Sequence, residues 1–134
     1  MLIIKTMKKL LFIVLLLTAG SLLFTGCKKS GESPSDVSES KLTGKWLYVK
    51  VVDVEDGDTD TETFSNGEYV TFNKDGSAFN SESNETAQWS LSGNKLSLNY
   101  GIETEVAEVK KITGSELVLF YQEGGYTSPI YFKR

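Results

Sequence analysis

Alternation of apolar and polar residues is the main pattern in the chain after Leu42. It is regular over Ala87-Gln88-Trp89-Ser90-Leu91 and again over Leu96-Ser97-Leu98-Asn99-Tyr100. Between these stretches, Ser92-Gly93-Asn94-Lys95 contains residues that tolerate a positive φ. A period of two interrupted by such residues is typical of a β-hairpin. This part of the chain shows no convincing helical period.

The same pattern predicts about eight strands in succession. Further turns are indicated at 73–76, 114–115 and 124–125, where glycines accompany small or polar residues. The predicted strands cover 45–54, 69–72, 78–79, 87–91, 96–100, 104–112, 116–122 and 126–133. Short links favour an antiparallel meander, and closing it into an up-and-down barrel hides its edges. We therefore expect one all-β domain over residues 42–134, with a two-sheet sandwich as the structural alternative.

The first 26 residues have a different pattern. Met7-Lys8-Lys9 precedes an apolar run from Leu10 to Leu17, which is followed by the small and polar residues Thr18-Ala19-Gly20-Ser21. A basic segment, a short apolar segment and then small residues is the layout of a secretory signal peptide. We expect residues 1–26 to be such a signal, with translation starting at Met1 or Met7.

Cys27 is the only cysteine, and the chain has no histidine. An internal disulfide, a Cys-His catalytic pair and a zinc site of ordinary ligand count are therefore excluded. The residues before it, Leu23, Phe24, Thr25 and Gly26, together with Cys27 resemble a bacterial lipobox. The resemblance implies that Cys27 becomes the lipidated N-terminus, carrying a diacylglycerol and an acyl chain such as palmitate. At about 0.8 kcal/mol per buried methylene, two or more chains anchor a protein firmly. An uncleaved membrane anchor and a secreted protein with a free thiol are the alternatives.

Residues 27–41 contain Gly31, Pro34 and several serines but almost no apolar side chain, which predicts a flexible tether. The whole chain has a net charge of −4, and Lys5, Lys8 and Lys9 all lie in the signal region. The rest is therefore more acidic still, which argues against nucleic acid as a partner. We expect a lipid-anchored protein of the cell envelope at the outer membrane, and the sequence leaves open whether it faces the periplasm or the surface.

Leu42-Thr43-Gly44-Lys45-Trp46 opens the first predicted strand with a Gly-x-Trp motif. With the segments 69–76, 88–96 and 112–119, it is similar to the small lipocalin-like lipoproteins of Gram-negative bacteria. The resemblance spans residues 42–134 and implies a barrel with one closed end. Gly44 and Trp46 would form the base, and Arg134 or Lys133 from the last strand would cover the indole in a cation-π contact.

The resemblance also raises the question of a ligand. An eight-stranded barrel is filled by side chains or holds one small ligand. Tyr48, Trp89 and Tyr100 are the candidate ligand-facing residues for a small apolar or amphipathic molecule. A filled core is the alternative, in which case the protein is an interaction module that contacts another envelope or extracellular protein. For that module Tyr121, Tyr126 and Tyr131 are the candidate exposed contacts, because tyrosine is enriched at interfaces, and packing in the core is the alternative for all three.

Residues 53–62 are strongly acidic, and oxygen-rich loops can bind Ca²⁺. The EF-hand spacing fails, however, because counting back from Gly57 places Val52 at the first ligand position. We expect a solvated loop here and no metal site. No pair of acid and base residues stands out by spacing, so we expect neither catalysis nor a cofactor.

Overall fold

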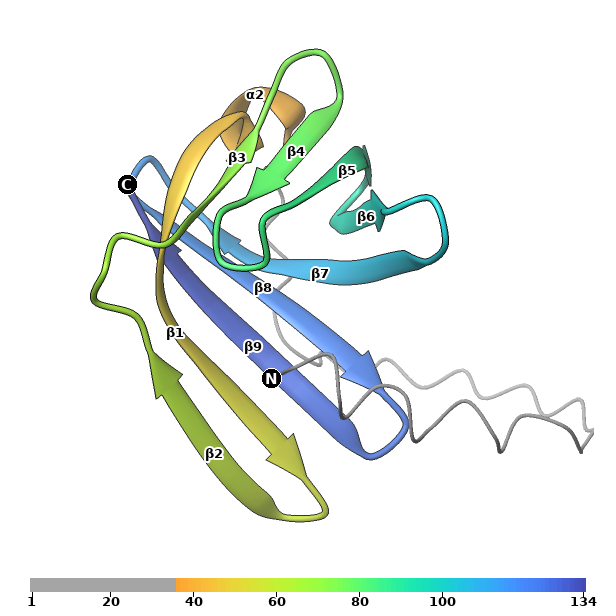
Figure 1. Cartoon of the computed structure of the whole chain (residues 1–134). Helices are drawn as coiled ribbons and strands as arrows, with labels where there is room; N and C mark the ends of the chain where they lie inside the picture. The colour runs from red at the N-terminus through yellow and green to blue at the C-terminus, as the bar shows by residue number, and fades with distance from the viewer. Residues whose placement is uncertain (1–35) are drawn as a thin grey trace, which may run out of the picture.

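The computed structural model describes residues 36–134 (Figure 1). The predicted signal peptide, the lipobox with Cys27, and residues 27–35 of the tether lie outside the described residues. A short helix, α2 (Glu39–Leu42), is followed by nine strands: β1 (Gly44–Glu55), β2 (Asp58–Thr63), β3 (Tyr69–Phe72), β4 (Ser77–Asn80), β5 (Glu85–Ser92), β6 (Lys95–Asn99), β7 (Thr104–Ile112), β8 (Glu116–Glu123) and β9 (Tyr126–Lys133). Within this range, no helix has the length and apolar character needed to cross a membrane.

Eight of these strands form a closed antiparallel barrel. From β3 to β9 each strand pairs with the next along the chain, β1 pairs with β3, and β1 also pairs with β9. The first and last strands therefore close the barrel, as in an up-and-down topology. The prediction of an all-β meander closed into a barrel is confirmed, and the sandwich alternative is excluded.

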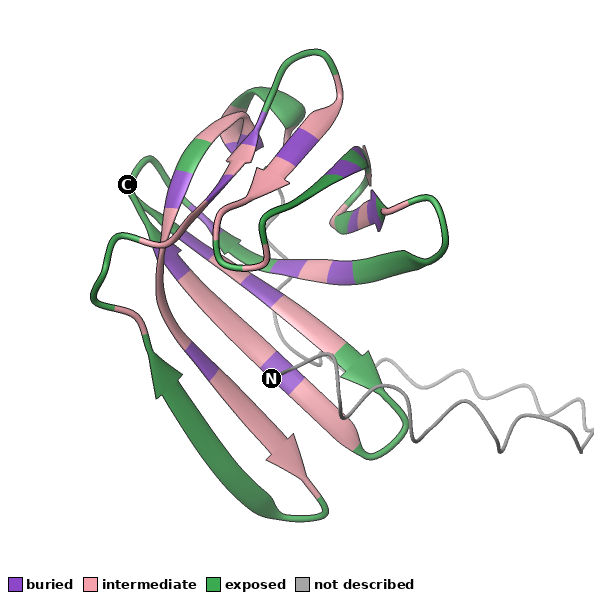
Figure 2. Cartoon of the chain, viewed as in Figure 1, coloured by how far each residue is buried: buried purple, intermediate pink, exposed green. Residues whose placement is uncertain are grey.

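The apolar residues of the alternating sequence pattern point to the inside of the barrel, and the polar residues point to the outside. Along β6, Leu96 and Leu98 are buried while their neighbours are not, and β8 repeats this with Leu117 and Leu119. Figure 2 shows the resulting stripes of buried residues across the strands. The inward side chains form one core whose largest fully buried members are Trp46, Phe72, Leu42, Leu96, Leu117 and Val109.

Strand β1 is long enough to pair with two strands along one edge. Its first part, Gly44 to Leu47, pairs with β3, whereas Lys50 to Glu55 pairs with β2. On the other edge β1 pairs with β9 from Leu47 to Glu55, with a bulge between Tyr48 and Lys50 that bends the strand. The outer part of β1 therefore lies in a four-stranded extension, ordered β2, β1, β9 and β8, which projects beyond the other strands (Figure 1).

The barrel opens between β7 and β8. These strands pair only through 108–112 of β7 and 117–120 of β8. The start of β7 pairs with β6, and the end of β8 pairs with β9. The start of β7 and the end of β8 thus separate from each other at one end of the barrel, which we call the open end.

Strand β2 corrects the expectation of a solvated loop over residues 53–62. Residues 58–63 pair with β1 in unbroken register from Asp58 to Thr63. The connection is the two-residue turn Asp56-Gly57, in which both residues have positive φ, 52° and 88°. Such a turn matches the twist of antiparallel strands, and Asp-Gly is among its preferred sequences. The hairpin therefore forms without any apolar residue in its second strand.

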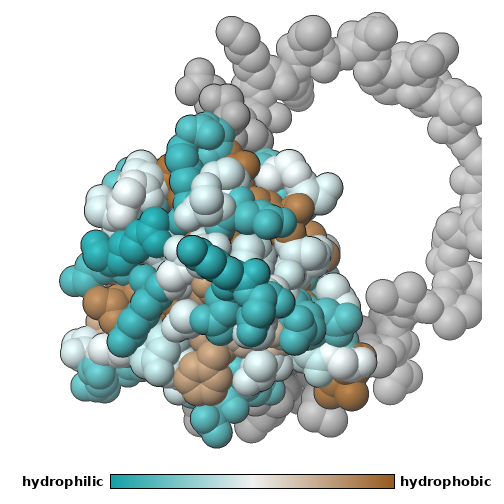
Figure 3. Space-filling model, turned by 90° about the horizontal axis from the view of Figure 1, so that it is seen from above, coloured by the Kyte–Doolittle hydropathy of each residue, from teal (hydrophilic) through white to brown (hydrophobic). Residues whose placement is uncertain are grey.

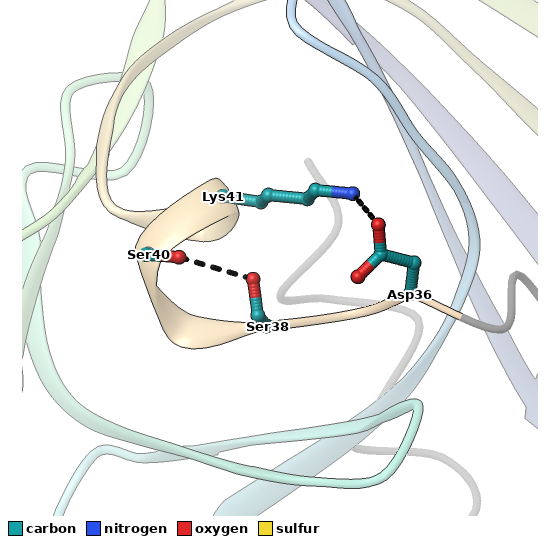
Figure 4. A network of polar contacts seen from close by, with 4 residues as sticks. All are labelled: Asp36, Ser38, Ser40 and Lys41. Atoms are coloured by element: carbon teal, nitrogen blue, oxygen red, sulfur yellow. Dashed lines mark hydrogen bonds and ion pairs between the residues drawn. The ribbon is translucent and has the colours of Figure 1, made fainter.

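The structure also places the last residues of the predicted tether. Glu39 to Lys41 belong to α2, and Val37 packs against the core. Lys41 pairs with Asp36, and the hydroxyls of Ser38 and Ser40 lie 3.1 Å apart (Figure 4). Leu42, at the end of α2, is fully buried. The chain thus enters the barrel through an ordered turn.

Candidate functional site

Trp46 fills the closed end of the barrel. Its side chain is 0% exposed, and its Nε1 donates a hydrogen bond to the carbonyl of Leu42 at 2.8 Å. This bond gives the buried indole N–H the partner that it needs. Trp46 therefore joins β1 to α2 beneath the barrel.

Arg134 covers the outer face of this indole. Its Cζ lies 4.0 Å from the ring centroid, which is the contact that the resemblance implied for the last strand. The guanidinium also donates to three backbone carbonyls: Nε to Gly114 at 3.0 Å, Nη1 to Thr43 at 3.1 Å and Nη2 to Lys41 at 2.9 Å. One side chain thus links the chain's end to α2, to the start of β1 and to the β7–β8 turn.

Gly44 is required by this arrangement. Its φ is +123°, a backbone conformation that residues other than glycine rarely adopt. A Cβ added there would lie 3.1 Å from Nη1 of Arg134. The Gly-x-Trp motif therefore supplies both the buried indole and the space for the arginine above it.

The open end has a different inner surface. Tyr48 lies on the inner face of β1 and Tyr121 on the inner face of β8, the two strands that flank β9, while Tyr100 and Glu105 stand on either side of the β6–β7 turn. Glu105 contributes to the raised pKa of all three tyrosines. We call these four residues the open-end cluster. Tyr48, Tyr100 and Tyr121 are only partly buried and pack against the edge of the core. The apolar interior of the base thus gives way to phenol and carboxyl groups.

The electrostatics of the open-end cluster favour neutral side chains. Burial, followed by the nearby carboxylates of Glu105 and Glu85, raises the pKa of Tyr100 to about 12. Burial likewise raises the pKa of Tyr121 well above its ordinary value, and Glu105 adds to the effect. The pKa of Glu105 itself is raised by desolvation, with a further contribution from Glu103. The phenols therefore remain protonated hydrogen-bond donors throughout the neutral range.

The three candidate ligand-facing residues occupy two places. Tyr48 lies in the open-end cluster with Tyr100, and its pKa is raised mainly by burial, with Tyr100 next. Trp89 instead lies in the core, where it contacts Phe72 edge-on and donates from Nε1 to the carbonyl of Asn73 at 3.0 Å. The structure brings the two tyrosines together and places the tryptophan below them.

Two members of the cluster were not among the residues singled out for a ligand. They are Glu105, which the sequence does not single out for any site, and Tyr121, which the sequence offers as a contact for a protein partner. The signal for Tyr121 was present, because it continues the alternation of Leu117 and Leu119 on the inner face of β8. Glu105 similarly stands two residues before the buried Ala107.

A second polar group lies on the inner face of the four-stranded extension. The same Oδ1 of Asp53 accepts hydrogen bonds from Tyr126 and from Ser128, each at 2.6 Å. Burial and the bond to Asp53 raise the pKa of Tyr126 to about 12. These contacts join residues far apart in the sequence and fix the outer part of β1 against β9.

The expectation that Tyr121, Tyr126 and Tyr131 form one exposed surface is wrong. All three are half-buried, and they lie on two faces. Tyr121 and Tyr126 are on the inner face, whereas Tyr131 is on the outer face beneath the ammonium of Lys50, 4.7 Å from its ring centroid. Tyr131 follows Tyr126 by five positions, an odd number, so a regular strand must point the two side chains in opposite directions.

Two hollows open on the outer wall of the barrel. One, of about 270 Å³, lies between β7 and β8 beside Val106 and Phe120, and the other, of about 330 Å³, lies over Val118 and Tyr131. Seen from above, the surface is largely hydrophilic, and its hydrophobic residues are scattered (Figure 3). Among residues 36–134, no three Asp, Glu, His or Cys side chains gather as a metal site.

Comparison with protein families matches residues 42–119 to the lipocalin-like domain. The chain belongs to this family. No curated protein and no solved structure matches the chain. The matched region of the lipocalin-like domain includes Gly44, Trp46 and three members of the open-end cluster, but it ends before Tyr121 and Arg134. The arginine cover and the last tyrosine of the cluster are therefore seen in the structure outside the matched region.

Proposed function

We propose that this lipocalin-like domain is a binding module that is held at the cell envelope through a lipidated Cys27 and takes a small amphipathic ligand at the open end. The observation that carries the proposal is the change of lining along the barrel. The base is sealed and filled by Trp46 and its neighbours, whereas the inner surface at the other end presents phenol and carboxyl groups.

The chemistry of the open-end cluster sets the ligand class. Tyr100 and Tyr121 supply protonated hydroxyls, and their rings offer flat apolar surfaces. Glu103 and Glu85 add negative charge near Glu105, so a group that donates hydrogen bonds or carries positive charge would be bound better than an anion. The ligand would therefore lie across the open end with its apolar part against the tyrosine rings and its polar head toward Glu105.

The filled base limits how deeply a ligand can enter. Trp89, Phe72 and Leu96 occupy the interior below the cluster. A long acyl chain buried along the barrel axis is therefore disfavoured, and a compact molecule is expected. A carrier that buries a fatty acid deeply would instead need this part of the interior to be empty.

Native mass spectrometry of the lipid-anchored protein, extracted gently from the host envelope in detergent, tests the proposal directly. A discrete added mass that disappears on denaturation is expected. In a displacement assay with a fluorescent amphipathic amine, Tyr100→Phe and Glu105→Gln should weaken binding, whereas Tyr131→Phe on the outer face should not. A clean apo mass together with equal behaviour of all three variants would refute binding at the open end.

A further inference from the structure

Strand β2 has one edge without a neighbour. Among the described residues it pairs with β1 alone, whereas the eight barrel strands each have a partner on both sides over part of their length. Its six residues are all exposed, and it is uniformly so in Figure 2. It contains no proline and no bulge, so the backbone runs regularly from Asp58 to Thr63. Proline and bulges are two of the devices by which sheet edges are commonly blocked.

The backbone groups on this edge can be assigned from the register. The N–H of Phe64 donates to the carbonyl of Val49 at 3.0 Å, so residue 64 faces β1. Alternation in an antiparallel ladder then directs the N–H and C=O groups of Thr59, Thr61 and Thr63 away from β1. The edge therefore presents three donors and three acceptors at the spacing of a sheet.

The side chains divide into two faces of opposite character. Asp58, Asp60 and Glu62 stand on the same face as Asp53 and Glu55, their register partners or neighbours in β1. The three threonines stand on the other face, opposite Val52 and Val54. Any strand added to this edge would place every second side chain beside carboxylates and the others beside methyl groups.

The carboxylates of β2 lack compensating charge. Asp60 lies directly opposite Asp53, and Asp58 lies opposite Glu55, although like charges in such positions destabilise a sheet. Among the residues that the structure describes, no ion pair includes Asp58, Asp60 or Glu62. A second copy of the chain would add identical carboxylates, so pairing of two β2 edges is opposed by charge.

We propose that the free edge of β2 is a docking site for an extended segment of another protein that carries Lys or Arg at alternate positions. The segment adds one antiparallel strand beside β2, and its basic side chains lie over Asp58, Asp60 and Glu62. Its remaining side chains, best β-branched, pack beside the threonine face. This inference does not depend on ligand binding at the open end.

The test uses the full-length protein in detergent micelles and synthetic peptides. The probe is an acetylated and amidated peptide of sequence Thr-Lys-Val-Lys-Thr-Lys-Val, and its controls are a scrambled peptide of the same composition and one with Glu in place of Lys. We expect saturable binding of the alternating peptide that weakens as salt is raised, and slower hydrogen exchange at the amides of Thr59, Thr61 and Thr63. Equal binding of the scrambled peptide would reduce the effect to general charge attraction and overturn the proposal.

Two further comparisons distinguish the contribution of backbone hydrogen bonds to peptide binding from that of charge. Thr61→Pro removes an outward N–H, and we expect it to weaken binding about tenfold or more, whereas Thr61→Val should bind as the parent does. If Thr61→Pro fails to fold, N-methylation of the peptide gives the same information. Methyl groups on the alternate residues facing β2 should abolish binding, and methyl groups on the other alternate residues should be tolerated.

Charge selection is tested by the combined change Asp58→Asn, Asp60→Asn and Glu62→Gln. This variant should lose most of its affinity for the lysine peptide and most of the salt dependence. No binding by the parent, or binding that neither N-methyl series changes, would mean that the carboxylates only protect the edge from aggregation, and the proposal would fail.

Discussion

Removal of the Arg134 side chain tests how the closed end is held. In Arg134→Ala the domain loses the cation-π contact with Trp46 and three hydrogen bonds to backbone carbonyls. Because the arginine is exposed on its outer side, we take about 1 kcal/mol for the cation-π contact and about 0.5 kcal/mol for each hydrogen bond. The expected loss is about 2.5 kcal/mol, which corresponds to a fall in Tm of about 10 to 20 °C for a domain of this size.

The assay is urea unfolding followed by tryptophan fluorescence and by far-ultraviolet circular dichroism. Arg134→Lys serves as the matched variant, since it keeps the charge over the indole but cannot reach three carbonyls from one planar group. We expect it to lose about half as much free energy as Arg134→Ala. A loss below about 0.5 kcal/mol in Arg134→Ala, the usual range for a surface substitution, would refute the argument.

A double-mutant cycle with Gly44 sharpens this test. Gly44→Ala places a Cβ close to Nη1 of Arg134 and imposes strain at φ +123°, which together should cost about 2 to 4 kcal/mol. In the Arg134→Ala background the contact with the guanidinium is absent, so the same change should cost less. Additive effects would show that the two residues do not interact.

Three further predictions concern other parts of the molecule. An unfolded tyrosine ionises near pH 10.0, whereas Tyr100 retains its proton up to about 12. The free energy of unfolding should therefore fall as pH rises above 10, because the unfolded state then binds fewer protons. Parallel urea titrations and phenolate absorbance measure this fall, and a flat stability profile would contradict it. Gly57→Ala should destabilise the β1–β2 hairpin by about 1 kcal/mol because φ is +88° there. Faster amide exchange confined to β2 would report the effect, and unchanged exchange would count against the assigned turn. Cys27→Ser should release the protein from membranes and abolish acyl labelling in cells, and labelling that persists would exclude Cys27 as the attachment point.

The strands that could be predicted from the sequence are those that bury one face. Along β6 and β8, alternation of leucine with polar residues marks both the strand and its inner side. Strand β2 has no buried residue, so the burial pattern gives no signal for it. Its indication was instead the Asp56-Gly57 turn, which the acidic composition of the segment obscured.

The candidate site was harder to predict because it depends on barrel closure. Tyr48 and Tyr121 come onto neighbouring parts of one inner face only when β1 and β8 both pair with β9, and no local sequence pattern indicates the pairing of β1 with β9. Asp53 similarly finds Tyr126 and Ser128 across the same seam. Conversely, the cover of Trp46 by Arg134 followed from a family resemblance, since nothing in the residues around Arg134 points to an indole.

The pairing of β1 with β9 also determines when the domain can fold during synthesis. Strand β1 lacks its partner on one edge until the eight residues of β9 are available, and Arg134, which directly follows β9, completes the base. Contacts between the two ends of the sequence make folding slow relative to that of proteins with local contacts. A nascent chain of this topology thus stays open until β9 has been synthesised, and truncation within β9 should impair folding of the whole barrel.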